Sequence, residues 1–216
     1  MIGGPPRPDR IPMKHATVHA LPRDEFRVEL GELRGEVERL SAELEELRSH
    51  AANLETLALE DPLTGLLNRR GFMRDLTRAI AYRARYGSPA ALMLADLDRF
   101  KPINDTYGHA VGDRALAHLS ALLRGHIRAS DSLGRLGGDE FGLILWQVDE
   151  GIACKKAAAL QAIVAGAPLV LGGLTLRLSA SIGCTRFEAD DTPEEALRRA
   201  DAAMYRQKAE RGVERA

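Results

Sequence analysis

Two consecutive glycines followed by two acids stand past the middle of the chain, in the segment Arg135–Phe141 (Arg-Leu-Gly-Gly-Asp-Glu-Phe). Gly137 and Gly138 favour a tight hairpin turn, because glycine accepts positive φ angles and lets a bulky ligand approach the backbone. Neighbouring side chains of a strand leave opposite faces, so Asp139 and Glu140 cannot both point into a core. At least one carboxylate is therefore expected at an open turn, where it suits a hard cation such as Mg²⁺. A hairpin with merely solvated acids is the alternative.

A short apolar run that ends in acids, residues 90–98, adds a second constraint. It predicts a buried central strand whose end places Asp96 and Asp98 on one face. If this strand is the antiparallel neighbour of the glycine hairpin, Asp96 converges with Asp139 or Glu140. Carboxylates crowded in this way repel one another unless a cation lies between them, and Mg²⁺ with phosphate oxygens is the usual solution.

Four further side chains could serve a nucleotide at such a site. Lys101 and Lys208 could reach a triphosphate as point charges. Asn104 and Asp113 offer an amide and a carboxylate, and a carboxylate can accept from N1–H and the exocyclic amine of guanine, a donor pair that adenine lacks. Each residue also has an ordinary surface or capping role, and Asp113 is expected in the first turn of a helix. Spacing alone leaves both interpretations open.

Periodicity and turn residues predict the remaining elements of this region. Thr192 and Pro193 are typical of the cap and first residue of a helix. The expected helices cover residues 71–86, 99–104, 111–128, 149–165 and 194–211, and the expected strands cover residues 169–170 and 174–181 and a run that closes at 184.

The N-terminal part has two different compositions. Residues 1–25 hold five prolines and scattered basic residues, which predicts a disordered leader. Over residues 26–60, apolar residues alternate steps of four and three in a heptad pattern, which predicts a parallel coiled-coil dimer. Glu29 with Arg34 and Glu43 with Arg48 are the expected pairs between its two strands. The alternative is an amphipathic helix packed on its own domain. The heptad residues are Phe26, Leu30, Leu33, Val37, Leu40, Leu44, Leu47, Ala51, Leu54 and Ala58.

Composition excludes several classes of protein. A net charge of −1 gives no electrostatic reason to expect binding to nucleic acid. Cys154 and Cys184 are too few for a disulfide framework and fit a reducing cytoplasm. No run is long and apolar enough to span a membrane, and the N-terminus lacks the apolar centre of a signal peptide. The expectation is a soluble cytoplasmic protein.

Several ordered motifs together resemble the GGDEF family of diguanylate cyclases: residues 61–70, 96–109, 112–113, 135–141, 180–183 and 200–205. The resemblance assigns residues 61–216 to the catalytic domain. It implies an α/β (α+β) fold, with a five-stranded sheet wrapped by helices, similar to the palm of nucleotidyl cyclases and polymerases. It also implies the condensation of two GTP molecules into cyclic di-GMP with release of two pyrophosphates.

The resemblance further implies roles for individual residues. Asp96, Asp139, Glu140 and the Leu97 carbonyl would bind Mg²⁺ or Mn²⁺, and Glu140 would support the metal or the proton transfer. The substrate contacts it implies are guanine readers at Asn104 and Asp113, phosphate cations at Lys101 and Lys208, and the turn glycines Gly137 and Gly138.

Residues Arg128 to Asp131 match the family's RxxD site for inhibition by the product. A second arginine is often supplied by the following helix, but here that helix carries Lys155 and Lys156, so weaker inhibition is expected. The Lys208–Gly212 ending is one residue longer than usual for the family. Because the product is two-fold symmetric and each subunit holds one GTP, turnover requires a homodimer.

Three hypotheses follow. The first is a dimeric, feedback-inhibited diguanylate cyclase. The second is a relay that binds GTP or cyclic di-GMP without catalysis; such relatives tend to lose the metal acids or the glycine pair, which are intact here. The third is a coiled-coil interaction protein, which removal of residues 1–60 would distinguish from an enzyme.

Overall fold

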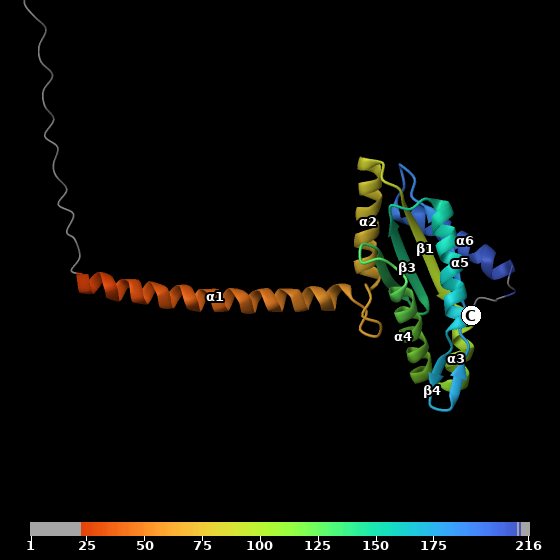
Figure 1. The fold of residues 1–216 in the computed structure, drawn as a ribbon, viewed down its shortest axis with the longest axis horizontal. Coiled ribbons are helices and arrows are strands. Elements are labelled where there is room, and N and C mark those ends of the chain that lie inside the picture. The colour runs from red at the N-terminus through yellow and green to blue at the C-terminus, as the bar shows by residue number, and fades with distance from the viewer. Residues whose placement is uncertain (1–22, 211, 213–216) are drawn as a thin grey trace, which may run out of the picture. The chain divides into compact units, whose positions relative to one another are not determined.

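The computed structural model describes residues 23–210 and residue 212, without the side chains of residues 23–26, 29, 49, 51–57 and 210. The expected leader therefore lies almost wholly outside the described residues, as does Arg211. The chain divides into two compact units, Met1–Ala51 and Ala52–Ala216. The elements, shown in Figure 1, are α1 (Arg23–Leu59), α2 (Arg69–Tyr86), β1 (Ala90–Leu97), α3 (Phe100–Tyr107), α4 (His109–Gly125), β2 (Ser132–Gly137), β3 (Glu140–Trp146), α5 (Glu150–Gly166), β4 (Leu169–Leu171), β5 (Leu174–Leu176), β6 (Ala180–Arg186) and α6 (Pro193–Glu210).

Helix α1 carries the heptad pattern on a single continuous helix. Its apolar side chains from Val28 to Leu47 are between 49% and 62% exposed. Within one chain, Arg39 pairs with both Glu36 and Glu43, and Arg48 pairs with Glu45. The side chains of Phe26, Glu29, Ala51 and Leu54 lie outside the described part. The coiled-coil dimer stays a prediction. The exposed apolar side chains of α1 would form its interface.

The main sheet has four antiparallel strands in the order β2-β3-β1-β6. The α+β fold class is confirmed, although this sheet has one strand fewer than expected. Strands β4 and β5 form a separate hairpin because Gly172, with φ of 57°, turns the chain between them. At the outer edge of β2, Leu67 makes an isolated parallel bridge to Gly134.

Helices cover both faces of the sheet (Figure 1), and the alternation along β1 separates two cores. Ala91, Met93, Ala95 and Leu97 pack in the cluster that includes apolar residues of α4 and α5. Ala90, Leu92 and Leu94 pack in the cluster that includes apolar residues of α2 and α6. Because side chains alternate along a strand, Asp96 points to the face covered by α2 and α6.

Helix α6 lies directly against β6. A Cβ atom added to Gly183 would come 2.2 Å from the Met204 backbone nitrogen, so only glycine permits this approach. Thr192 and Glu195 form a capping box: the Glu195 N–H donates to Thr192 Oγ1, and the Thr192 N–H donates to Glu195 Oε2. The expected helix start is confirmed.

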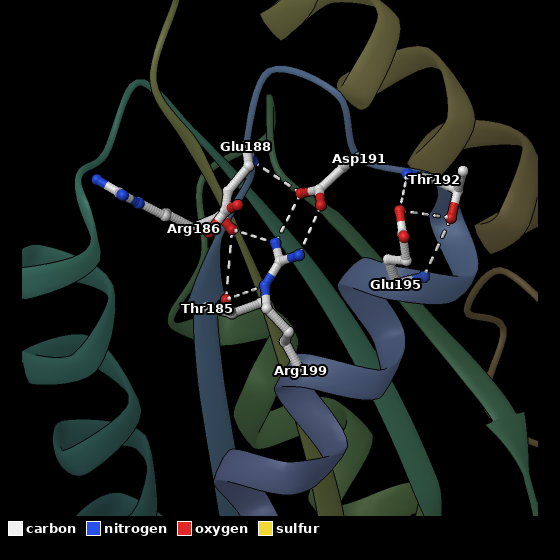
Figure 2. A network of polar contacts seen from close by, with 7 residues as sticks. All are labelled: Thr185, Arg186, Glu188, Asp191, Thr192, Glu195 and Arg199. Atoms are coloured by element: carbon white, nitrogen blue, oxygen red, sulfur yellow. Dashed lines mark hydrogen bonds and ion pairs between the residues drawn. The ribbon is translucent and has the colours of Figure 1, made fainter.

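Arg199 anchors the first half of α6 to the end of β6, as Figure 2 shows. Its two terminal nitrogens each donate to one oxygen of Asp191 at 2.6 Å, and it also donates to Thr185 Oγ1 and the Arg186 carbonyl. The bond from Arg199 is the largest cause that lowers the pKa of Asp191, although partial burial opposes it. This paired carboxylate holds α6 in one register along the sheet.

Three expectations about local structure are corrected. Cys154 of α5 and Cys184 of β6 form a disulfide with a Cα–Cα distance of 5.8 Å, because α5 packs on β6. Residues 105–107, expected in a loop, extend α3 up to Gly108. Helix α4 ends at Gly125 instead of Arg128. Among the described helices, none has the length and apolar character needed to cross a bilayer.

Candidate active site

The glycine hairpin joins β2 to β3 at one end of the sheet. Gly137 has φ of 150° and Gly138 has φ of 52°, as the turn requires. Arg135 fixes the turn because its Nε and Nη2 atoms donate to the Gly138 carbonyl at 2.9 and 2.7 Å. The same guanidinium reaches Asp61 Oδ2 at 3.2 Å. The turn is thereby tied to the segment that follows α1.

Asp61 organises that segment. It accepts from both the N–H and the hydroxyl of Thr64, at 2.9 and 2.8 Å. Burial alone would raise the pKa of Asp61, but the Thr64 hydrogen bonds and the Arg135 charge together lower it. Asp61 and Arg135 both lie in motifs that the sequence shows, but their pairing could not be predicted from it, since 74 residues separate them.

The convergence of carboxylates expected from the sequence is confirmed. Asp96 of β1 lies directly opposite Glu140 of β3, and the Leu97 N–H donates to the Asp139 carbonyl at 3.2 Å. Asp96 is buried, Asp139 is half-buried, and Glu140 is exposed at the turn. The sheet register therefore brings the three acids to one end of β1 and presents Glu140 to solvent.

Lys208 of α6 completes this group in a way that sequence reasoning did not foresee. Its Nζ atom donates to Asp96 Oδ1 at 2.5 Å, and the residue is only 3% exposed. Burial raises the pKa of Asp96 to about 6; the Lys208 hydrogen bond opposes this shift, and the charges of Asp139 and Glu140 add to it. The contact requires α6 to cross the sheet at Gly183, which periodicity alone does not reveal.

Asp98 lies just beyond β1 and is 5% exposed. Its Oδ1 atom accepts from the Ser181 hydroxyl at 2.7 Å. Within the described residues, its Oδ2 atom is buried without a hydrogen-bond partner. Asp98 therefore adds an unpaired acceptor oxygen close to the end of β1.

Asn104 and Gly112 meet where α3 packs on α4. The Asn104 Oδ1 atom is buried and has no hydrogen-bond partner in the described part of the chain. A Cβ atom on Gly112 would lie 1.9 Å from this oxygen, so the glycine makes room for the amide. Asp113, the next residue, is exposed in the second turn of α4, and its expected place in the first turn is wrong because the helix already begins at His109.

Lys101 is exposed in the first turn of α3, immediately after the β1 end that carries Asp96. The two lysines expected at a triphosphate thus differ in the structure. Lys208 is buried against a carboxylate, whereas the side chain of Lys101 extends from the surface.

The donor set suits a small divalent cation. No group of three or more His, Cys, Asp or Glu side chains converges as a metal cage among the residues that the structure describes. Mg²⁺, however, is usually held by one or two carboxylates together with substrate phosphates, not by an all-protein cage. Asp96 and Asp139 supply hard oxygen atoms of this kind beside the glycine turn. The residues present fit such an ion.

The RxxD residues lie at the other end of the β2-β3 hairpin, on a cavity of about 790 Å³. Asp131 stabilises the local turn, because it accepts from the backbone N–H groups of Arg128 and Trp146. Arg78 of α2 and Arg124 of α4 line the same cavity, and Lys156 lines a smaller one beside Arg128. The sequence alone does not reveal these arginines, because their position depends on how α2 and α4 pack.

Comparison with known proteins connects this geometry to a family. Residues 58–213 match the family described as diguanylate cyclase, GGDEF domain. Diguanylate cyclase DgcP of Pseudomonas aeruginosa is 35% identical over 181 residues, which are 82% of this chain and 27% of that protein. The structure of diguanylate cyclase SiaD with its activator SiaC, also from Pseudomonas aeruginosa, gives a TM-score of 0.70 at 30% identity and covers 87% of this chain and 72% of that one.

A second solved structure contains the coiled coil and GGDEF domain of DgcB from Caulobacter crescentus in complex with c-di-GMP. It gives a TM-score of 0.75 at 27% identity, over 83% of this chain and 95% of that one. The chain spans less than half the length of the curated relatives it matches. The matched residues include the glycine hairpin, Asp96, Asn104 and Lys208. The chain therefore belongs to the GGDEF diguanylate cyclase family.

Proposed function

We propose that the protein is a diguanylate cyclase that condenses two GTP molecules into cyclic di-GMP and releases two pyrophosphates. The observation that carries this proposal is the register of β1 and β3, which sets Asp96 opposite Glu140 beside the glycine turn. Family membership supports it, since residues 58–213 match the diguanylate cyclase domain. The intact acids and glycines favour catalysis over the alternative of a non-catalytic GTP or cyclic di-GMP relay.

Recognition of guanine is assigned to Asn104 and Asp113. The buried Asn104 oxygen needs a donor, and guanine offers N1–H and its exocyclic amine. Lys101 and Lys208 would bind the triphosphate as point charges, and Gly137 and Gly138 would let it approach the backbone of the turn.

The reaction is an in-line attack of a 3′-hydroxyl on an α-phosphorus, which forms a P–O bond and breaks the bond to pyrophosphate. Two such attacks close the ring of the product. Glu140, exposed at the turn, would support the metal or take the proton of the hydroxyl. Asp96, Asp139, Glu140 and the Leu97 carbonyl would hold Mg²⁺ or Mn²⁺, which neutralises charge on the phosphates when bound.

Two GTP molecules on separate subunits can react only if two active sites face each other, so the proposal includes a homodimer. The exposed apolar stripe of α1 supports a parallel coiled coil, which would raise the effective concentration of two catalytic domains. The DgcB fragment whose structure resembles this chain also comprises a coiled coil and a GGDEF domain. GTP as substrate favours action in the cytoplasm, whereas the Cys154–Cys184 disulfide is unusual in a reducing compartment.

Product inhibition is proposed at the cavity that Arg128 lines. Arg78 and Arg124 line the same cavity, together with Glu60 and Asp75, and are the candidates for the second arginine that α5 lacks. Because Asp131 stabilises the turn, Arg128→Ala is the cleaner probe. It should relieve inhibition by cyclic di-GMP without lowering the initial rate, as measured from progress curves with added product. Unchanged inhibition would place the site elsewhere.

The direct test uses the purified chain of residues 1–216 freed of bound nucleotide. It is incubated with GTP and Mg²⁺ at several protein concentrations, and pyrophosphate release and the identity of the product are followed. Formation of cyclic di-GMP, with a specific rate that falls on dilution, is the expected result. Tight GTP binding without product at any concentration would favour the relay instead.

A further inference from the structure

Lys208 is buried at the point where the active-site acids converge. Its Nζ atom lies 2.5 Å from Asp96 Oδ1, and its side chain is 4% exposed. Asp96 itself lies opposite Glu140 and close enough to Asp139 for the two charges to repel. A buried carboxylate among other acids needs a counter-ion, and in this structure the ammonium of Lys208 supplies it.

The Asp96 carboxylate also belongs to the donor set proposed for the divalent cation. A carboxylate in hydrogen-bond contact with an ammonium group is a poorer ligand for a second cation, because the two positive charges repel at close range. Lys208 and the metal ion therefore compete for Asp96 as long as the Lys208 ammonium stays bound to it.

The fold leaves Lys208 free to change partners while its helix stays fixed. The α6 backbone lies against Gly183 at Ala200 and Met204, and Arg199 anchors the helix further upstream. Lys208 follows these contacts, in the last turn of the helix. Its flexible four-carbon stem can move the ammonium from Asp96 to a triphosphate without moving α6.

We propose that Lys208 is the counter-ion of Asp96 in the nucleotide-free protein and competes there with the divalent metal. A nucleoside triphosphate then draws the Lys208 ammonium away from Asp96. The inference rests on the proposed function, since it assigns Lys208 to both states of that site. Metal and GTP then bind cooperatively: the triphosphate removes the competing charge from Asp96, and the metal in turn strengthens nucleotide binding.

The proposal predicts effects of opposite sign for one substitution. Lys208→Met should tighten the binding of metal to the nucleotide-free protein, because the competing cation is gone. It should weaken the binding of nucleotide, because a phosphate contact is lost. A lysine that served only the phosphates would weaken nucleotide binding and leave metal binding to the free protein unchanged.

The test measures Mn²⁺ binding to the nucleotide-free chain of residues 1–216 by the electron paramagnetic resonance signal of free Mn²⁺. Wild type, Lys208→Met, Lys208→Gln and Lys101→Met are compared, each after circular dichroism has verified folding. Both Lys208 variants should bind Mn²⁺ about tenfold more tightly than wild type, as expected for removal of one buried opposing charge. Lys101→Met is the matched control, because this lysine is exposed, and it should stay within about twofold of wild type.

The titrations are repeated with 3′-deoxy-GTP, which lacks the attacking hydroxyl, and corrected for Mn²⁺ bound by the nucleotide alone. The nucleotide should increase Mn²⁺ affinity more in wild type than in Lys208→Met, because only wild type has a lysine to displace. Unchanged or weaker Mn²⁺ binding in both free Lys208 variants overturns the proposal, as does an equal gain in Lys101→Met. If instead Mn²⁺ binds to no variant, with or without 3′-deoxy-GTP, the metal site of the proposed function fails as well.

Discussion

Asp139 and Glu140 are adjacent in sequence but differ in environment, since Asp139 is half-buried and Glu140 is exposed at the turn. Neither contributes to the apolar core, so Asp139→Asn and Glu140→Gln should leave the fold intact. Each should lower the rate of cyclic di-GMP formation at least about a hundredfold, because charge opposite the reacting phosphate is lost. Pyrophosphate release measures the rate, and thermal unfolding verifies the fold.

Asp190→Asn provides the control for these two variants. Asp190 is an exposed acid in the loop between β6 and α6, and β6 runs away from the Asp96 end of β1 to reach that loop. Its replacement should leave the rate unchanged. Normal turnover in both hairpin variants would contradict the assignment of the active site.

The environment of Asp96 predicts how stability depends on pH. Burial and the neighbouring acids raise the pKa of Asp96 from 3.8 to about 6, despite Lys208. Between these values the folded protein holds a proton that the unfolded chain has released, so the free energy of unfolding should fall as pH rises from about 4 to about 6. Above about pH 6 this loss is complete.

Urea unfolding in EDTA across pH 4 to 7 measures the effect, with Asp96→Asn as the reference. The variant differs from wild type in more than this proton, because the substitution also changes the group to which Lys208 donates. The informative quantity is therefore the difference in the free energy of unfolding between the two proteins as a function of pH. Wild type should lose stability relative to the variant as pH rises through this window, and the opposite slope would contradict the raised pKa.

At the scale of elements, the position of α6 decides where Lys208 lies. Arg199 pairs with Asp191, whose side chain is 3% exposed, so Arg199→Ala leaves a buried carboxylate without its cation. The free energy of unfolding should fall by about 2 kcal/mol, a value below that of fully buried pairs because Arg199 is partly exposed. GTP affinity should fall as well, since α6 loses its fixed register (Figure 2).

Arg198→Ala is the matched control, because Arg198 is the preceding residue of the same helix and is exposed. Denaturant unfolding and GTP titration should show little change for this variant. Equal effects of the two substitutions on stability and on GTP affinity would mean that the Asp191 contact does not position the helix.

Much of the element pattern could be predicted from the sequence, because it rests on local signals. The Gly137-Gly138 turn and the apolar run before Asp96 fix a hairpin and a central strand, and their pairing brings the acids together. The Lys208–Asp96 contact and the Cys154–Cys184 disulfide could not be predicted. Both contacts depend on which helix packs against β6, and the hydrophobic periodicity of a helix does not predict where it packs.

The length of α3 could not be predicted from the sequence either. The sequence predicted that this helix ends at Asn104, but it continues through Tyr107, and Asn104 packs against Gly112 of α4. Packing between α3 and α4 overrides local propensity here. The buried Asn104 oxygen, a candidate reader of guanine, is a consequence of that packing.

At the scale of the whole molecule, the decisive question is whether α1 brings two catalytic domains together. Its apolar side chains from Val28 to Leu47 are exposed in the single chain, and burying them between two copies would stabilise a dimer. Removal of residues 1–51 tests this role without cutting the second compact unit, which begins at Ala52. The cut also keeps the end of α1, where Asn68 donates to the Ala58 and Glu60 carbonyls.

The truncated protein should be monomeric at concentrations where the full chain is dimeric, as light scattering after gel filtration would show. Its specific rate of cyclic di-GMP formation should rise with protein concentration, because two active sites must then meet by diffusion. A chain lacking only residues 1–22 is the control and should behave as the full chain does. If the truncated protein keeps the full rate at every concentration, α1 does not supply the contact that catalysis needs; if it loses all activity even when concentrated while remaining folded, α1 acts on the active site beyond holding two copies together.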